Sequence, residues 1–189
     1  MKYSEIRDQI KTGDVFSCCG KRSWFSKAIT IFQGGSEITH SALAIWTDFP
    51  GVENGRLCIY ESMEPGGVRL TPLSIALESY AKEGGHIYWQ PLIDSNINNR
   101  LVVQYALQQW TKAYASIYQI ALIVSPWLRL LRKLRGGNWD TDKNRFICSE
   151  LVISSLAAGG YDHQKEKAFT TPDEVSNLRC LGPKILIEV

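Results

Sequence analysis

Residues 40–63 of the chain are HSALAIWTDFPGVENGRLCIYESM. Both ends of this stretch, residues 40–46 and 57–63, are rich in the β-branched, aromatic and other apolar residues typical of strands. The polar loop between them contains turn-forming residues: Pro50, Gly51, Asn54 and Gly55. The stretch therefore predicts an antiparallel hairpin whose second strand runs back beside the first.

Weaker patterns extend outward from this hairpin. The turn residues 12–14 precede a short apolar strand at Val15 and Phe16, and further strands are expected at 67–70, 86–91 and 184–189. Apolar residues at helical spacing predict helices over 4–10, 24–32 and 99–112, and another that begins near Cys148 and ends at Gly159. Helices and strands do not alternate regularly, so we predict an α+β fold with a mainly antiparallel sheet, or a small barrel, packed against helices.

Length and composition set the outer limits. A chain of 189 residues with 44% hydrophobic residues suits one core, so residues 1–189 are expected to form a single domain. The net charge of +2 gives no global electrostatic reason to expect nucleic acid as a partner. The first residues, MKYSEIRDQIKTGD, contain no apolar core of the kind that a signal peptide needs, so the protein is expected to be cytoplasmic as synthesised.

Five cysteines are an odd number, so at least one thiol is free and a reducing compartment is favoured. No CxxC is present, and His40, His86 and His163 lack the close spacing of zinc ligands. We therefore expect neither a metal nor another cofactor. The adjacent Cys18 and Cys19 are interpreted as buried small side chains or a loop feature, and His86 and His163 as exposed residues.

The segment from Ile117 to Arg135 is apolar, contains Pro126 and ends in several basic residues. Its interruptions argue against a transmembrane span. One hypothesis is a pair of buried helices broken at Pro126. The other is a basic amphipathic surface that makes peripheral contact with a membrane.

Cys148 opens the helix-forming sequence CSELVISSL. The positive end of a helix and its unpaired N–H groups lower the pKa of a cysteine, and the thiolate is the nucleophile. A structural cysteine would explain the position alone equally well. The surrounding residues therefore decide between the two interpretations.

A nucleophilic cysteine needs an imidazole, and the imidazole needs a polar group that holds its orientation. His40 opens an apolar strand and is the candidate base. The hairpin brings residues 60–64 across from it, so Glu61 is the preferred orienting residue and Glu64 is the alternative, because sequence does not fix strand register.

The order of these parts resembles the circularly permuted NlpC-type branch of the papain-like family, to which the lecithin:retinol acyltransferase group is related. The resemblance rests on five short stretches spread over nearly the whole chain: residues 13–16 (GDVF), 39–42 (THSA), 60–62 (YES), 148–151 (CSEL) and 171–174 (TPDE). It implies a papain-like fold with Cys148 as nucleophile, His40 as base and Glu61 as its orienting partner. It also implies an aromatic residue lining the cleft, for which Tyr114 and Tyr118 are candidates, although the small-Pro-Tyr-Asp run usual in relatives is absent.

This resemblance implies a cysteine peptidase or amidase that cleaves cell-wall peptides, such as peptidoglycan fragments. Such a substrate lies outside the cytoplasm, so delivery by lysis or secretion would be needed. A lipid-directed acyl hydrolase or acyltransferase is an alternative, suggested by the permuted order and the segment from Ile117 to Arg135. A second alternative is a catalytically inactive binding module with the same fold.

Overall fold

The computed structural model describes residues 1–20, 30–31, 35–48, 55–63, 66–114, 145–163 and 170–189. Six strands form an open, antiparallel sheet in the order β4-β3-β2-β1-β5-β8. In chain order they are β1 (Val15–Cys19), β2 (His40–Thr47), β3 (Arg56–Met63), β4 (Gly67–Pro72), β5 (His86–Gln90) and β8 (Ile185–Ile187). A separate parallel pair consists of β6 (Ala113–Tyr114) and β7 (Arg145–Phe146).

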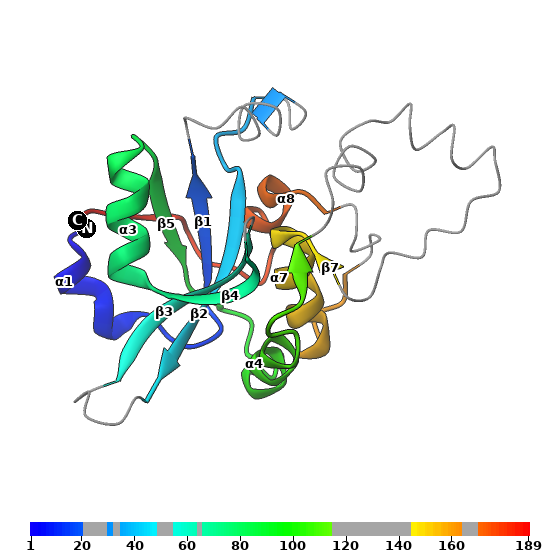
Figure 1. Cartoon of the computed structure of the whole chain (residues 1–189). Coiled ribbons are helices and arrows are strands. Elements are labelled where there is room, and N and C mark those ends of the chain that lie inside the picture. Colours follow the sequence, from blue (N-terminus) through cyan, green and yellow to red (C-terminus); the bar gives the residue numbers. More distant parts are fainter. Residues whose placement is uncertain (21–29, 32–34, 49–54, 64–65, 115–144, 164–169) are drawn as a thin grey trace, which may run out of the picture.

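Helices cover both faces of the sheet (Figure 1). Their bounds are α1 (Tyr3–Ile6), the 3-10 helix η1 (Arg7–Gln9), α3 (Leu73–Lys82), α4 (Asn99–Gln108), α7 (Cys148–Ala158) and α8 (Pro172–Ser176). One face packs against α3, and the other packs against α7 with α4 and α8 beside it. The expected α+β class and mainly antiparallel sheet are confirmed.

The predicted hairpin is confirmed as β2 and β3, with Leu43 opposite Tyr60. Side chains alternate between the two faces of a strand, so Leu43 and Tyr60 point toward α7 while their neighbours Ala44 and Ile59 pack on the α3 side. This two-sided burial explains why β2 is apolar almost throughout rather than alternating with polar residues.

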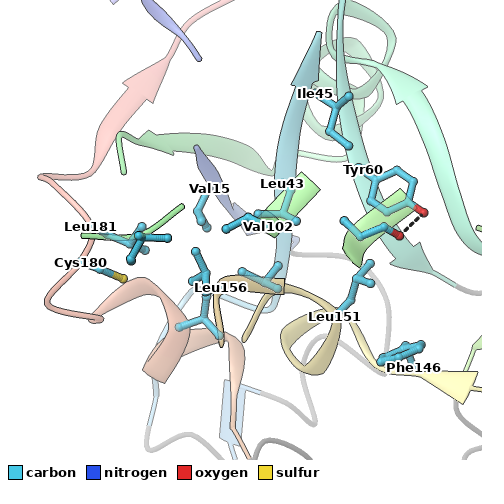
Figure 2. Packing of buried hydrophobic residues seen from close by; sticks show 14 of the residues in the cluster. Val15, Leu43, Ile45, Tyr60, Val102, Phe146, Leu151, Leu156, Cys180 and Leu181 are labelled. Atoms are coloured by element: carbon cyan, nitrogen blue, oxygen red, sulfur yellow. Dashed lines mark hydrogen bonds between the residues drawn. The ribbon is translucent and has the colours of Figure 1, made fainter. Parts of the chain in front are cut away.

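The core between the sheet and α7 fixes the position of that helix (Figure 2). Leu151 and Leu156 on α7 are fully buried in the same cluster as Leu43. The Tyr60 hydroxyl donates a hydrogen bond of 2.8 Å to the carbonyl oxygen of Ala106, which ties β3 to α4. The first residue of α7 is thereby held at a fixed place relative to β2 and β3.

Several elements differ from the sequence-based expectation. The expected first helix forms as α1 followed by η1, and β1 extends to Cys19. Helix α4 ends at Gln108, before the expected end near residue 112, because Thr111 adopts a φ of 67° and its N–H bonds to the carbonyl of Val68. Helix α3 was not expected. The helix expected at 24–32 lies largely outside the described residues, and the segment from Ile117 to Arg135 lies wholly outside them.

Within the described part of the chain, no helix combines the length and apolarity needed to cross a membrane. The two ends of the chain lie side by side (Figure 1). Lys2 forms a β-bridge with Glu188, and the N–H of Tyr3 donates to the Glu188 carbonyl at 2.9 Å.

Candidate functional site

Cys148 is the first residue of α7, as its sequence context predicts. The chain reaches it from β7 through Ile147, which has extended backbone angles and forms the N-cap. The first turn of a helix has N–H groups without intrahelical partners, and these stabilise a nearby anion. The side chain is nearly covered, because Cys148 is only 5% exposed.

His40 is the first residue of β2 and is also buried. Two hydrogen bonds hold the segment that precedes it: Thr39 N–H donates to the Cys18 carbonyl at 2.9 Å, and Ser36 Oγ donates to Asp173 Oδ1 at 2.6 Å. Asp173 lies in α8, whose N-terminus is closed by a capping box between Thr171 and Glu174. The stretch 171–174 therefore has a structural role in fixing the segment that leads into His40.

Glu61 lies near the end of β3 with its carboxylate between two cationic partners. Its Oε2 is 2.9 Å from Nε2 of His40. Its Oε1 accepts hydrogen bonds of 3.1 Å from Nε and from Nη2 of Arg69. Glu61 is 3% exposed, so its interaction with the buried His40 is shielded from water, whereas Arg69 reaches the carboxylate from a partly exposed position. Glu64, the alternative third residue, lies outside the described part of the chain.

The buried thiol and imidazole shift each other's pKa in opposite directions. Burial raises the pKa of Cys148, but His40 and the backbone N–H groups of Ser41 and Ser149 outweigh it, so the pKa is lowered. Burial lowers the pKa of His40, but Cys148 and Glu61 outweigh it and raise the pKa to about 10. Each shift favours a thiolate next to an imidazolium.

Glu61 contributes to the same charge distribution. Burial raises the pKa of its carboxyl group, but hydrogen bonds and charge interactions with His40 and Arg69 outweigh burial and lower the pKa. The His40 imidazole therefore interacts both with a carboxylate and with the Cys148 thiol. The structure brings together the three residues Cys148, His40 and Glu61 that the sequence singled out.

Arg69 was missed by the sequence analysis. It lies on β4 directly opposite Glu61 in the strand register. The sequence GGVRL gives no reason to connect Arg69 with a glutamate eight positions earlier until the β3–β4 register is known. Its role is to keep Glu61 charged while leaving one carboxylate oxygen for His40.

Of the two aromatic candidates, Tyr114 lies in the described part of the chain, on β6. The backbone of Tyr114 pairs with that of Phe146, two positions before Cys148, so β6 runs beside the strand that leads to the thiol. Tyr118 lies outside the described residues. Tyr114 therefore lies close to the N-terminus of α7, where the thiol is located.

The Gly13–Asp14 turn supports the far end of the sheet. The Asp14 carboxylate accepts hydrogen bonds from Trp89 Nε1 at 2.8 Å and from the N–H groups of Leu92 and Lys11 at 2.9 and 2.8 Å. Gly13 has a φ of 96°, a conformation that favours glycine. These two residues therefore hold β1, β5 and the following loop together.

The other thiols and histidines have different surroundings. Burial raises the pKa of Cys18, Cys58 and Cys180. His86 and His163 are partly buried rather than exposed, which corrects the sequence-based interpretation: each has a hydroxyl neighbour that holds its ring, Tyr88 and Thr170 respectively.

Fold and site together define an α+β protein with a buried Cys-His-Glu cluster between a sheet and the start of a helix. No family model matches the chain. It is 26% identical over 174 residues, 82% of this chain and 68% of the other, to the uncharacterized protein R372 of Acanthamoeba polyphaga mimivirus. The crystal structure of the metalloprotein yiiX from Escherichia coli O157:H7, described as DUF1105, has a similar fold, with a TM-score of 0.55 and 16% identity over 94% of this chain and 89% of that one.

Proposed function

We propose that the chain is a cysteine-dependent acyl hydrolase with a permuted papain-like fold of the NlpC type. The observation that carries this proposal is the coupling between the buried Cys148 thiol and the His40 imidazole, whose pKa shifts favour the ion pair. A buried cysteine without catalytic function has a raised pKa, as Cys58 does. The early strand that carries the histidine and the late helix that carries the cysteine are in the order of the permuted branch.

The reaction begins with attack of the Cys148 thiolate on the carbonyl carbon of an amide, ester or thioester. A carbon–sulfur bond forms, and the carbonyl electron pair moves to the oxygen. The backbone N–H of Cys148, at the start of α7, stabilises this oxyanion. The His40 imidazolium then gives its proton to the leaving nitrogen, oxygen or sulfur as the bond to it breaks, which leaves an acyl-enzyme thioester.

Water completes the cycle. Neutral His40 removes a proton from the water as its oxygen attacks the thioester carbonyl, and collapse of the intermediate releases the acid and the Cys148 thiolate. Glu61 holds the ring orientation and stabilises the imidazolium in both halves of the cycle. If an alcohol or amine replaced water at this step, the same residues would perform acyl transfer.

Peptides or amides of the cell-wall type are the substrates that we place first, and peptidoglycan fragments are the natural test. The alternative is a fatty acyl substrate at a membrane surface, with the segment from Ile117 to Arg135 as the contact. Neutralising Arg129, Arg132 and Lys133 would then abolish liposome binding. A panel of peptidoglycan fragments, acyl peptides and fatty acyl esters distinguishes these substrate classes.

The decisive experiment measures hydrolysis and thiol labelling on the same preparations. We expect Cys148→Ala to abolish turnover with its fold intact, and His40→Ala to reduce both turnover and the selective labelling of Cys148 near neutral pH. Cys58→Ser is the matched control, because Cys58 is another buried thiol, on strand β3. Full turnover in Cys148→Ala, or equal labelling of all five cysteines in the native protein, would refute the proposal and favour an inactive binding module.

A further inference from the structure

A second group of thiol, imidazole and carboxylate lies where β1 ends and β5 begins. Cys19 Sγ, a ring nitrogen of His86 and a carboxylate oxygen of Glu37 all lie within 4.8 Å of one another. Among the residues that the structure describes, this is the one group of three His, Cys, Asp or Glu side chains whose ligand atoms come so close together. It shares no residue with the Cys148 cluster.

Strand register explains why two of these side chains meet. Cys19 and His86 are directly opposite each other in the antiparallel pair of β1 and β5, and opposite residues project their side chains from the same face. Gly85 precedes His86, and a Cβ atom at this position would collide with the Cys19 carbonyl oxygen. Glycine therefore allows the two strands to approach closely at the point where the thiol and the imidazole lie.

Tyr88 joins the other two members of the group. Its hydroxyl donates a hydrogen bond of 3.0 Å to Glu37 Oε1 and lies 3.2 Å from Nε2 of His86. Its ring meets the His86 ring edge to face, with centroids 5.0 Å apart. A hydroxyl in this place orients both candidate ligands, as outer-shell groups do in metal sites.

We propose that Cys19, Glu37 and His86 bind a divalent transition metal of the Zn²⁺ type. Tetrahedral Zn²⁺ with bonds of about 2.0–2.3 Å separates its ligand atoms by roughly 3.3–3.8 Å, which a small contraction of this group achieves. Thiolate and imidazole ligands favour Zn²⁺ or Co²⁺ over Mg²⁺ and Ca²⁺, which prefer oxygen.

The charges and the number of the three ligands also suit a divalent ion such as Zn²⁺. A thiolate and a carboxylate together balance the two positive charges of the metal, while neutral His86 adds a third ligand. Three protein ligands leave one tetrahedral position for water or another small ligand. Cys19 is fully buried and Glu37 is exposed, so the ion would have protein on one side and solvent on the other.

A metal ion at this site would also stabilise the segment that leads into β2. Glu37 is three positions before His40, and the intervening Ile38 and Thr39 are buried. A metal held by Glu37 would therefore fasten the segment that leads into β2 to the ends of β1 and β5. No sequence pattern predicts this site, because the three ligands come from separate segments rather than from a closely spaced motif.

Titration of the full chain with Co²⁺, which reports thiolate ligation by a charge-transfer absorption band, tests the site. The protein should also carry Cys148→Ser, so that the thiol of the Cys-His-Glu cluster cannot contribute to the band. We expect one equivalent to bind with this band, and Cys19→Ser to abolish it. We expect His86→Gln and Glu37→Gln to weaken binding more than about 100-fold and Tyr88→Phe about tenfold, because outer-shell changes cost about 10–100-fold.

Cys58→Ser is again the matched control and should leave the titration unchanged. Far-ultraviolet circular dichroism and thermal unfolding verify that each variant is folded. If Cys19→Ser fails to fold, the exposed Glu37→Gln and the partly buried His86→Gln decide the question. Absence of a thiolate band in the folded protein, or a band of unchanged affinity in His86→Gln, would overturn the proposal.

Discussion

Replacing Glu61 by glutamine keeps the shape of the side chain and removes its charge. In the native protein the carboxylate lies 2.9 Å from His40 Nε2 and is nearly fully buried, so the charge acts on the imidazole with little screening by water. A hydrogen bond to a charged partner contributes about 1.5–3 kcal/mol, and one pKa unit corresponds to about 1.36 kcal/mol. We therefore expect Glu61→Gln to lower the pKa of His40 by about one to two units.

The direction of the effect on the thiol follows from the coupling of the two groups. The imidazolium lowers the pKa of Cys148 only while it keeps its proton, so a less basic His40 stops stabilising the thiolate at a lower pH. The thiolate–imidazolium pair exists above the pKa of the thiol and below the pKa of the imidazolium, which is about 10 in the native protein. In Glu61→Gln the upper boundary moves to lower pH, so the pH range in which the ion pair is populated becomes narrower.

The assay is the rate of Cys148 alkylation by iodoacetamide as a function of pH, followed by mass spectrometry of the peptide that contains it. The native profile should begin to rise below pH 9.0, because the pKa of Cys148 is lowered from this reference value. In Glu61→Gln the further change in rate that accompanies loss of the imidazolium proton should occur at a lower pH than in the native protein. Glu78→Gln is the control, since Glu78 is an exposed glutamate on α3. A Glu61→Gln profile that superimposes on the native one, in a protein of unchanged fold, would refute the assigned role of Glu61.

Three further changes test the scaffold. Gly13→Ala should reduce the free energy of unfolding measured in urea by more than Gly84→Ala does. Both glycines have a positive φ, but only at Gly13 would a Cβ atom collide with a neighbouring side chain. Equal losses of free energy would contradict this account. Tyr60→Phe should lower the same free energy by about 1 kcal/mol through loss of its buried hydrogen bond, and no loss would contradict it. Ser36→Ala should slow alkylation of Cys148, because Ser36 anchors the segment before His40 to Asp173; an unchanged rate would show that this anchor does not position the imidazole.

Sequence patterns were informative where local chemistry determines the structure. The hairpin formed by β2 and β3 follows from two apolar runs separated by turn residues, and the start of α7 follows from helical spacing after a polar loop. Glu61 could be proposed because antiparallel pairing brings residues near 60–64 beside the start of β2. The choice between Glu61 and Glu64 required the register, which sequence does not specify.

Features that depend on long-range pairing were not predictable. Helix α3 buries Leu73, Ala76 and Leu77 at helical spacing, but the pattern is short and follows directly after a strand. Arg69 becomes relevant only through its position opposite Glu61. The two-residue strand β6 exists only because its partner β7 returns from a distant part of the chain.

The contrast between the two thiol clusters argues for different chemistry at each. A metal ligand must be deprotonated, and His40, with a pKa raised to about 10, holds its proton at neutral pH. Its partner Glu61 is already engaged with Arg69, so a divalent cation at Cys148 would have to displace a proton and compete with a guanidinium. The His40 imidazolium stabilises the Cys148 thiolate without a metal ion, which leaves the sulfur available to attack a carbonyl carbon. At Cys19 the neighbouring carboxylate of Glu37 adds negative charge, which favours a metal ion over a free nucleophile.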